Sequence, residues 1–520
     1  MKIPNFLAVL LACVVLLTAC GTKPAEQTST IPVVQVPTAP AYDSATQILL
    51  DDGGITVDGA AIGTEVAAAV YAANDIVYYE SGKDYTYGEG GEKDAHSPEE
   101  AAGHTVVHIT KPGAYILSGR LSLGQIAVDL GNDAKKDPNA VVTLVLNGVD
   151  ITCEVAPAVI FYNVYECGND DAEKASKDVD TSAAGANVII ADGTINTVNG
   201  SYVEKIYKPD SVVLNDDKTE VEDADKLHKY DGAFYSKRSI NIFGGKENTG
   251  VLNIKAENEG LDSEMHLTIN GGNIHIESGN DGINTNEDGV SVTTINGGKL
   301  TVNVTGETGE GDGIDSNGWL VINGGTVVAA ACSNSADAGI DSDMGIHING
   351  GTVVATGHML DRIEDGGQNY AVFHFAQKQT GGETVTMKDQ DGKVILEVKP
   401  VNAYAILIFS SPDLKTGNYS LWSNEKQLSG SSNGMMGGPG MRPGGMDRPE
   451  HPDNMQPPDD EKQPPEGFTP PEGGNRPEMP GGNRPGNAEG NNLGVQEMTT
   501  DFVIRDGGNM FSGVSHNDMQ

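Results

Sequence analysis

Short runs of alternating apolar and polar residues cover much of the chain, and between residues 231 and 357 they recur with a fixed period. The tetrad Ile-Asn-Gly-Gly occurs four times there, and its asparagines are 26, 27 and 26 residues apart, at Asn270, Asn296, Asn323 and Asn349. A short strand-like segment with alternating apolar residues follows each tetrad. Strands this short cannot bury a core alone, so a period of about 20 to 30 residues predicts a parallel β-helix, a solenoid of stacked repeats.

A second motif precedes each tetrad and carries acidic residues. Its pattern is Gly-[Ile/Leu]-[Asp/Asn]-[Ser/Thr], at residues 260–263, 282–285, 313–316 and 339–342. Equivalent positions of stacked repeats lie about 4.8 Å apart. One column is therefore expected to hold Glu259, Asp281 and Asp312, with Asp231 and Asp337 beside it. A second column is expected to hold Asp262, Asn284, Asp315 and Asp341.

Carboxylates at this spacing repel one another unless they are protonated, well solvated or bridged by a cation. Ca²⁺ suits such columns, because it takes 6 to 8 oxygen ligands and tolerates mixtures of carboxylate, amide and carbonyl groups. The alternative is turn chemistry, since Asp, Asn and Gly are also the residues that corners of a solenoid require. The columns hold more acids than turns need, which favours calcium, and all nine residues are its candidate ligands.

The rest of residues 45–366 also predicts an all-β protein. Short strands are expected at 106–109, 114–117, 125–130, 141–146, 158–162 and 187–191, with turn sequences between them. Residues 65–73 are rich in alanine and predict a short helix. The charged segments 170–184 and 215–229 are expected to be loops.

Beyond the repeats the pattern changes. Residues 367–428 predict a β cap, which the exposed last repeat of a solenoid needs. Residues 429–494 are rich in Gly and Pro with almost no branched apolar residues, so this tract is predicted to be disordered. Residues 495–520 have strand character at 502–504 and are expected to return to the sheet of the cap.

The N-terminus predicts export. Lys2 precedes an apolar run over residues 6–17, and Leu17-Thr18-Ala19-Cys20 has the form of a bacterial lipobox. Residues 1–19 are thus expected to be a lipoprotein signal peptide, Cys20 the lipidated residue, and 20–44 a tether on the extracellular face of the cell membrane. The alternative is an ordinary signal peptide with a chance cysteine. No other segment has the ~18 consecutive apolar residues of a membrane span.

Charge and cysteine content narrow the classes of function. The 520 residues include 33 basic and 74 acidic side chains, a formal charge of −41, which argues against nucleic-acid binding. After Cys13 and Cys20, three cysteines remain. Cys153 and Cys167 could pair outside the cell, whereas Cys332 leaves an odd thiol and argues against a disulfide framework.

Eight short segments follow one another in a distinctive order, at residues 110–119, 124–129, 142–151, 187–194, 231–237, 259–263, 280–285 and 406–414. Taken together, they resemble a bacterial surface family of carbohydrate-binding domain-containing β-helix proteins. The resemblance implies a right-handed parallel β-helix, calcium held at Asp231, Glu259 and Asp281, and binding of cellulose or acidic sugars such as polygalacturonate. Where the family often has two adjacent acids, this chain has Asp231-Gly232, which predicts a weaker or displaced site.

The sequence therefore predicts a non-catalytic, calcium-dependent polysaccharide-binding lipoprotein. A calcium-dependent lyase is the first alternative, with Lys237 or Arg238 as the base. A calcium-stabilised adhesin or spacer is the second. Aromatic residues that could stack on sugars, or simply cover the end of the solenoid, are Tyr78, Tyr79, Tyr85, Tyr87 and Trp319.

Overall fold

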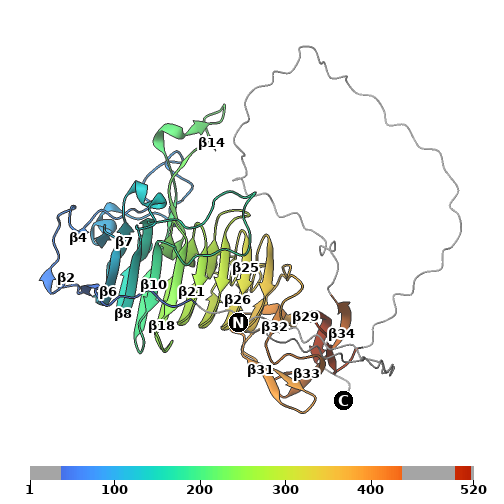
Figure 1. The fold of residues 1–520 in the computed structure, drawn as a ribbon. Coiled ribbons are helices and arrows are strands. Elements are labelled where there is room, and N and C mark those ends of the chain that lie inside the picture. The colour runs from blue at the N-terminus through green and yellow to red at the C-terminus, as the bar shows by residue number, and fades with distance from the viewer. Residues whose placement is uncertain (1–36, 436–497, 517–520) are drawn as a thin grey trace, which may run out of the picture. The chain divides into compact units, whose positions relative to one another are not determined.

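The computed structural model describes residues 37–435 and 498–516, which belong to one compact unit. The protein is all-β with large sheets, as the alternation predicted (Figure 1). Within the described ranges, helical structure is limited to α1 (Pro98–Ala102) and two 3-10 turns, η1 (Asn132–Lys136) and η2 (Pro209–Ser211).

The repeated tetrads follow one another across a ladder of parallel strands, named here the tetrad ladder. It contains β10 (Ala186–Ile190), β17 (Ile240–Gly244), β20 (Leu267–Ile269), β23 (Val292–Ile295), β25 (Trp319–Ile322) and β27 (Gly345–Ile348). Tetrad isoleucines pair in register, so that Ile295 lies between Ile269 and Ile322. The second glycine of each tetrad has a positive φ, +82° at Gly325, and a Cβ there would lie 2.8 Å from the Gly298 carbonyl oxygen. The tetrad therefore forms a turn in which the second glycine has a left-handed conformation, and neighbouring repeats are in contact there.

A second parallel ladder follows the tetrads. It contains β11 (Ile195–Gly200), β18 (Val251–Ala256), β21 (Asn273–Ser278), β24 (Lys299–Val304), β26 (Thr326–Ala330) and β28 (Thr352–Gly357). The long strand β8 (Val142–Cys153) pairs with both β10 and β11, so it belongs to both ladders. On its other side lies β6 (Gly113–Leu121), followed by β1 (Thr46–Leu50) with the short antiparallel strands β2 (Thr56–Val57) and β3 (Ala60–Ala61).

A separate seven-stranded sheet carries the first two acidic motifs, and the third adjoins it through an isolated bridge between Ile283 and Ile314. Its strands are β4 (Val70–Ala73), β5 (Thr105–Ile109), β7 (Gly124–Asp129), β9 (Val159–Asn163), β16 (Gly232–Ser236), β19 (Glu259–Ser263) and β22 (Ile283–Thr285). All neighbours pair in parallel except β4 and β5.

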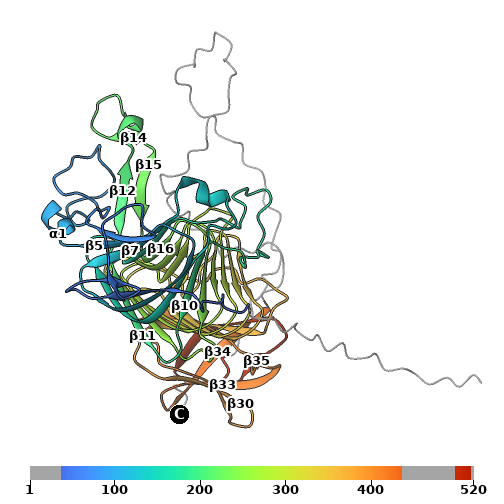
Figure 2. The same ribbon diagram turned by 60° about the vertical axis from the view of Figure 1, so that its left-hand side comes forward.

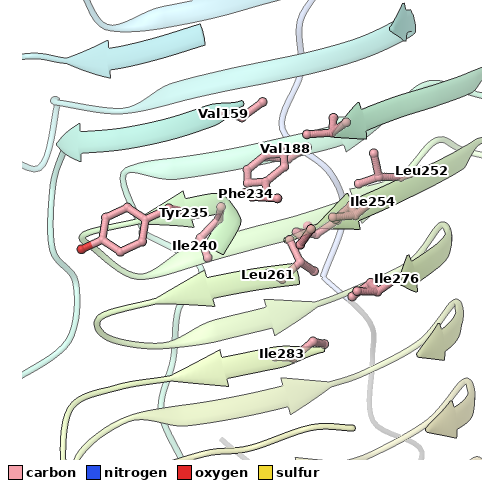
Figure 3. Close-up of a cluster of buried hydrophobic side chains, with 14 of the residues drawn as sticks. Val159, Val188, Phe234, Tyr235, Ile240, Leu252, Ile254, Leu261, Ile276 and Ile283 are labelled. Carbon is pink, nitrogen blue, oxygen red and sulfur yellow. The ribbon is translucent and has the colours of Figure 1, made fainter. Parts of the chain in front are cut away.

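The core lies between these sheets. Figure 3 shows Val188, Leu252 and Leu261 among the buried side chains, one each from the tetrad ladder, the second ladder and the seven-stranded sheet. All three are at most 1% exposed. Each fully buried aliphatic side chain contributes about 1.5–3 kcal/mol, so the repeated Ile, Leu and Val positions stabilise the stack of repeats.

Two local expectations were wrong. The expected helix at 65–73 is a turn followed by β4, because Val70 and Tyr71 are buried where β4 pairs with β5, and this pairing overrides the weak helix preference of alanine. The expected loop at 215–229 is partly an arm of two antiparallel pairs (Figure 2). The pairs are β12 (Val203–Tyr207) with β15 (Lys226–Tyr230) and β13 (Val213–Leu214) with β14 (Val221–Asp223).

The cap covers the last repeat by antiparallel pairing of β32 (Tyr404–Ser410) with β28. Its other strands are β29 (Tyr370–Gln379), β30 (Val385–Asp389), β31 (Val394–Val398), β33 (Gly417–Ser423) and β34 (Lys426–Met435). The C-terminal segment joins it through β35 (Phe502–Ile504) on β33 and β36 (Gly508–His516) between β29 and β34. Because β34 runs to Met435, the cap extends past residue 428 and the first residues of the expected disordered tract are strand.

Other expectations fall on residues 1–36 and 436–497, outside the described ranges. They are the signal peptide, lipidation of Cys20, most of the tether and the remainder of the disordered tract. In the described part of the chain, no helix has both the length and the apolar character needed to cross a membrane.

The disulfide that Cys153 and Cys167 could form is not present. Both residues have free thiols, as does Cys332. Cys153 ends β8 and is 2% exposed, whereas the thiol of Cys167 hydrogen-bonds to Ser239. Burial raises the pKa of both Cys153 and Cys167 to about 12, so both are inert neutral thiols.

Candidate calcium and carbohydrate site

Backbone pairing arranges the first set of acids in a column. The Glu259 N–H donates to the Asp231 carbonyl oxygen at 3.1 Å, and the N–H of the next residue, Gly260, donates to the Asp281 carbonyl at 3.0 Å. The glycine after Asp281 donates in the same way to the Asp312 carbonyl, at 3.1 Å. Asp231, Glu259, Asp281 and Asp312 therefore occupy successive levels of the stack.

The second set forms a parallel column. Asp262 on β19 pairs in register with Asn284 on β22. The Asp315 N–H donates to the Ile283 carbonyl at 2.8 Å, and the Asp341 N–H donates to the Ile314 carbonyl at 2.7 Å. The motif spacing thus placed both columns, whereas the role of these residues as calcium ligands stays a prediction.

Burial makes these acids electrostatically costly. Exposure is 5% for Glu259, 2% for Asp262 and 4% for Asp312. Burial, and after it the neighbouring carboxylates, raise the pKa of Glu259, Asp262, Asp281 and Asp312 well above the ordinary value, although the Asp312 N–H donates to the Asp281 carboxylate at 2.7 Å. Ionised carboxylates in such surroundings need a compensating positive charge.

Three side-chain oxygens near the Asp231 end of the columns, named here the upper group, have no hydrogen-bond partner among the described residues. They are Glu259 Oε2, Asp262 Oδ2 and Asn284 Oδ1. The other side-chain atoms of this group are paired, because Asn284 Nδ2 donates to Glu259 Oε1 at 3.1 Å and Asn286 Nδ2 donates to Asp262 Oδ1 at 2.8 Å. Leaving a buried polar atom unpaired costs about 1–3 kcal/mol, and more if it is charged. Carboxylate and amide oxygens of this kind are ligands that fit Ca²⁺.

A second group, named here the lower group, lies farther from Asp231 along the columns. One carboxylate oxygen each of Asp312, Asp315 and Asp341 lies within 4.8 Å of the others. Asp361, which the repeat pattern did not indicate, hydrogen-bonds with Asp341 and has a pKa raised by burial. Asp337 instead accepts a hydrogen bond from the Gly311 N–H at 2.6 Å and one from the Ser335 hydroxyl, so its carboxylate holds the backbone of the turn.

The Asp231 end of the first column contains a cation of the protein itself. Lys229 Nζ lies 3.2 Å from Asp231 Oδ2, and this carboxylate raises the pKa of Lys229. The repeat pattern did not indicate Lys229, although this residue lies only two positions before Asp231 in the sequence. Asp231 is therefore neutralised locally, in contrast to Glu259 and Asp262.

The aromatic residues are divided between packing and exposure. The Tyr79 hydroxyl donates to the Gly90 carbonyl at 2.9 Å, and the Tyr79 ring meets Tyr87 edge to face at 5.1 Å. Tyr85 donates to the Lys218 carbonyl at 2.7 Å, which connects the N-terminal segment to the arm. Tyr78 and Tyr87 line a shallow hollow of about 270 Å³ beside His228. Trp319 begins β25 and is half-buried.

The candidate lyase bases lie at the far end of β16 from Asp231. The five residues of β16 lie between Asp231 and Lys237, and six steps along an extended strand span about 20 Å. Burial, and after it the Arg238 charge, lower the pKa of Lys237. Arg238 Nε is buried without a hydrogen-bond partner in the described part of the chain.

Together these features define an all-β protein of stacked parallel strands with two columns of carboxyl and amide side chains. The chain matches the family of carbohydrate-binding domain-containing proteins over residues 103–398, more than half of its length. It belongs to that family.

Two known proteins are similar to parts of the chain. A carbohydrate-binding domain-containing protein of Acetivibrio thermocellus is 30% identical over 174 residues, or 33% of this chain and 45% of the relative. The match thus spans less than half of that relative. The solved structure of a polysaccharide lyase-like protein from C. thermocellum, in a gadolinium derivative, matches with a TM-score of 0.32 and 19% identity, over 58% of this chain and 90% of the other.

Proposed function

We propose that the protein is a calcium-dependent, non-catalytic polysaccharide-binding lipoprotein of the bacterial cell surface. The observation that carries the proposal is the set of unpaired oxygens on Glu259, Asp262 and Asn284, inside two columns of buried carboxyl groups. Family membership supports the carbohydrate part of the proposal. The three in-register parallel ladders support a right-handed parallel β-helix as the scaffold.

Calcium is held by the two groups of acids in this proposal. Glu259, Asp262 and Asn284 are ligands of the upper group, and Asp312, Asp315 and Asp341 are ligands of the lower group. Bound Ca²⁺ supplies the positive charge that lets these carboxyl groups ionise, and it can also take oxygen ligands from a sugar carboxylate. Backbone pairing fixes the positions of both columns, whether their carboxyl groups are protonated or ionised.

The charge of the protein makes calcium a requirement for acidic partners. A chain with a formal charge of −41 repels polygalacturonate unless a cation bridges the carboxylates of both. Lipidation of Cys20 would hold the β-helix at the membrane through residues 20–44. Metabolic labelling with palmitate should then mark the wild-type protein and not Cys20→Ser.

The first test is thermal unfolding of the full-length protein with calcium and with chelator. A ligand that binds only the native state raises its stability by mass action. A free calcium concentration about 100-fold above Kd raises the free energy of unfolding by about 2.7 kcal/mol. We expect calcium to raise the Tm of the wild type and of Glu277→Gln, an exposed acid on β21, but much less that of Asp262→Asn or Asp315→Asn. Equal Tm values in calcium and chelator would exclude the metal site.

The second test is retention on immobilised polygalacturonate. Binding in calcium that chelator abolishes supports the proposal, whereas the absence of any glycan preference would favour the adhesin or spacer alternative. A lyase is the second candidate, because the lowered pKa of Lys237 is what a catalytic base requires. Unsaturated ends accumulating with time, and lost in Lys237→Met, would establish the lyase instead.

A further inference from the structure

A groove lined by both polar and apolar side chains runs over the outer face of the tetrad ladder, away from the acidic columns. Its volume is about 350 Å³. One side consists of the four tetrad asparagines, the floor consists of residues on β17, β20, β23 and β25, and the opposite side is the segment 177–182. None of the predicted calcium ligands lines it.

The asparagines form a continuous amide ladder. Asn349 Nδ2 donates to Asn323 Oδ1, Asn323 Nδ2 donates to Asn296 Oδ1, and Asn296 Nδ2 donates to Asn270 Oδ1, each at 2.9 Å. A side-chain amide has two N–H donors and two acceptor lone pairs. The two inner members, Asn296 and Asn323, each use one donor and one lone pair in the ladder. Each therefore keeps a second donor and a second lone pair for a ligand at every level.

The floor repeats in register with the ladder. Asn241, Thr268, Thr294 and Val321 are paired successively across β17, β20, β23 and β25. Asn241 is 1% exposed, and its Oδ1 has no hydrogen-bond partner among the described residues. The groove thus offers the half-buried Thr294 hydroxyl beside the amides of the ladder, whereas Thr268 is buried and Val321 is apolar. The levels repeat at the strand spacing of about 4.8 Å over roughly 14 Å.

The segment 177–182 is held over the ladder as a wall. The Thr181 and Thr268 hydroxyls lie 2.8 Å apart, and Asn241 Nδ2 donates to the Thr181 carbonyl at 2.8 Å. At the other end, Lys177 and Asp178 lie close enough to His347 on β27 to shift its pKa. The wall therefore follows the stacking direction from β17 toward β27, the same direction as the asparagine ladder.

The charges in the groove are few and largely paired. Lys177 Nζ lies 2.6 Å from Asp178 Oδ1, and Asp180 is the remaining ionisable residue of the lining. This balance offers nothing to attract an anionic chain, whereas a row of amide and hydroxyl groups can both donate to and accept from sugar hydroxyls.

We propose that this groove binds a neutral, extended polysaccharide chain along the asparagine ladder, with Asn296, Asn323 and Thr294 contacting its hydroxyl groups. The proposal rests on the carbohydrate-binding function proposed above and gives it a second surface, separate from the calcium columns. The level spacing of about 4.8 Å is close to the length of one sugar unit in an extended chain, so the ladder accommodates roughly three units.

The test is titration calorimetry of the full-length protein in calcium, with cellohexaose and mannohexaose as neutral probes. Thr294→Arg places a long side chain in the groove and should weaken binding at least tenfold. The matched control is Thr301→Arg, a half-buried threonine on β24 outside the groove, which should change binding less than twofold. Thr294→Val and Thr301→Val, which keep the β-branched shape, repeat the comparison if the arginine variants do not fold, with a loss of about threefold expected for Thr294→Val only.

Retention on polygalacturonate in calcium, measured for the same proteins, separates the two proposals. Unchanged retention together with selective loss of hexasaccharide binding supports the groove. Equal effects of the Thr294 and Thr301 substitutions would overturn the groove and leave the proposed function standing. If the wild type retains polygalacturonate but binds no hexasaccharide, the groove is likewise overturned and the proposed function stands. If the wild type binds neither kind of glycan, the groove and the proposed function are both overturned.

Discussion

The ammonium group of Lys229 lies 3.2 Å from the carboxylate of Asp231, at the end of the first acidic column. Lys229 comes from β15 of the arm, and Asp231 directly precedes β16 of the seven-stranded sheet. The arm therefore supplies the column with a fixed cation, and one acid of the predicted calcium set is neutralised without a metal.

Removal of this cation should destabilise the protein. In Lys229→Met the Asp231 carboxylate, 12% exposed, loses its charged partner, which should cost about 2 kcal/mol. Urea denaturation in chelator measures the loss, and Lys229→Met/Asp231→Asn should recover most of it. Lys255→Met provides the control, because its exposed pair with Glu277 at 3.5 Å should contribute less than about 1 kcal/mol. Equal losses in the two single variants would contradict a special role for Lys229.

The buried carboxyl groups should make the calcium-free protein less stable as pH rises. The pKa values of Glu259, Asp262, Asp281 and Asp312 are raised in the folded state, so it binds more protons than the unfolded state does. Stability in chelator is therefore greatest below the unfolded pKa of about 4 and falls as pH increases through the raised values. Tm measured from pH 4 to 8 should decline in chelator and much less in calcium. A flat profile in chelator would show that these groups are ionised without cost.

Substitution of the second glycine of the tetrad should destabilise the protein in two ways, through its positive φ and through a clash with the neighbouring repeat. Gly325 has φ +82° and a Cβ there would lie 2.8 Å from the Gly298 carbonyl oxygen, whereas Gly289 has φ +64° and open space around the Cβ position. Gly325→Ala should therefore cost at least 1–2 kcal/mol more than Gly289→Ala, because only the first adds a clash to the strain of a left-handed alanine. Urea denaturation of both variants gives the difference, and similar losses would mean that the repeats can separate at this turn.

The thiols should be insensitive to redox conditions. With Cys153 and Cys167 free and their pKa values near 12, reductant should leave the Tm unchanged, and iodoacetamide should label Cys153 only after unfolding. Peptide mass spectrometry measures the labelling. A Tm that falls on reduction would indicate that Cys153 and Cys167 pair after all.

The sequence predicted the parts of the molecule that repeat. The tetrad isoleucines, the asparagine column and the two acidic columns follow from counting residues, because parallel pairing in register turns a sequence period into a spatial one. Segment 170–184 was expected as a loop and contains no strand, but nothing in its composition indicated that residues 177–182 lie over the tetrad ladder.

Residues outside the period could not be placed in this way. Lys229 lies only two residues from Asp231, but it is outside the repeats and nothing in their period marks it. Asp361 reaches Asp341 from beyond the last repeat, and this contact depends on how a non-repeating segment folds back. The helix expected at 65–73 failed for the same reason, because pairing with β5 decides its structure.

The way in which the C-terminal segment joins the cap determines what a break in the chain would do. Leu428 pairs with His516, and the Phe373 ring packs against the rings of Phe502 and Phe511, with centroid distances of 5.5 and 5.4 Å. Proteolytic cleavage anywhere between residues 436 and 497 would therefore leave two fragments that remain bound to each other. A premature stop codon in the same interval would instead remove two strands of the cap, expose Phe373 and leave an open sheet edge prone to aggregation.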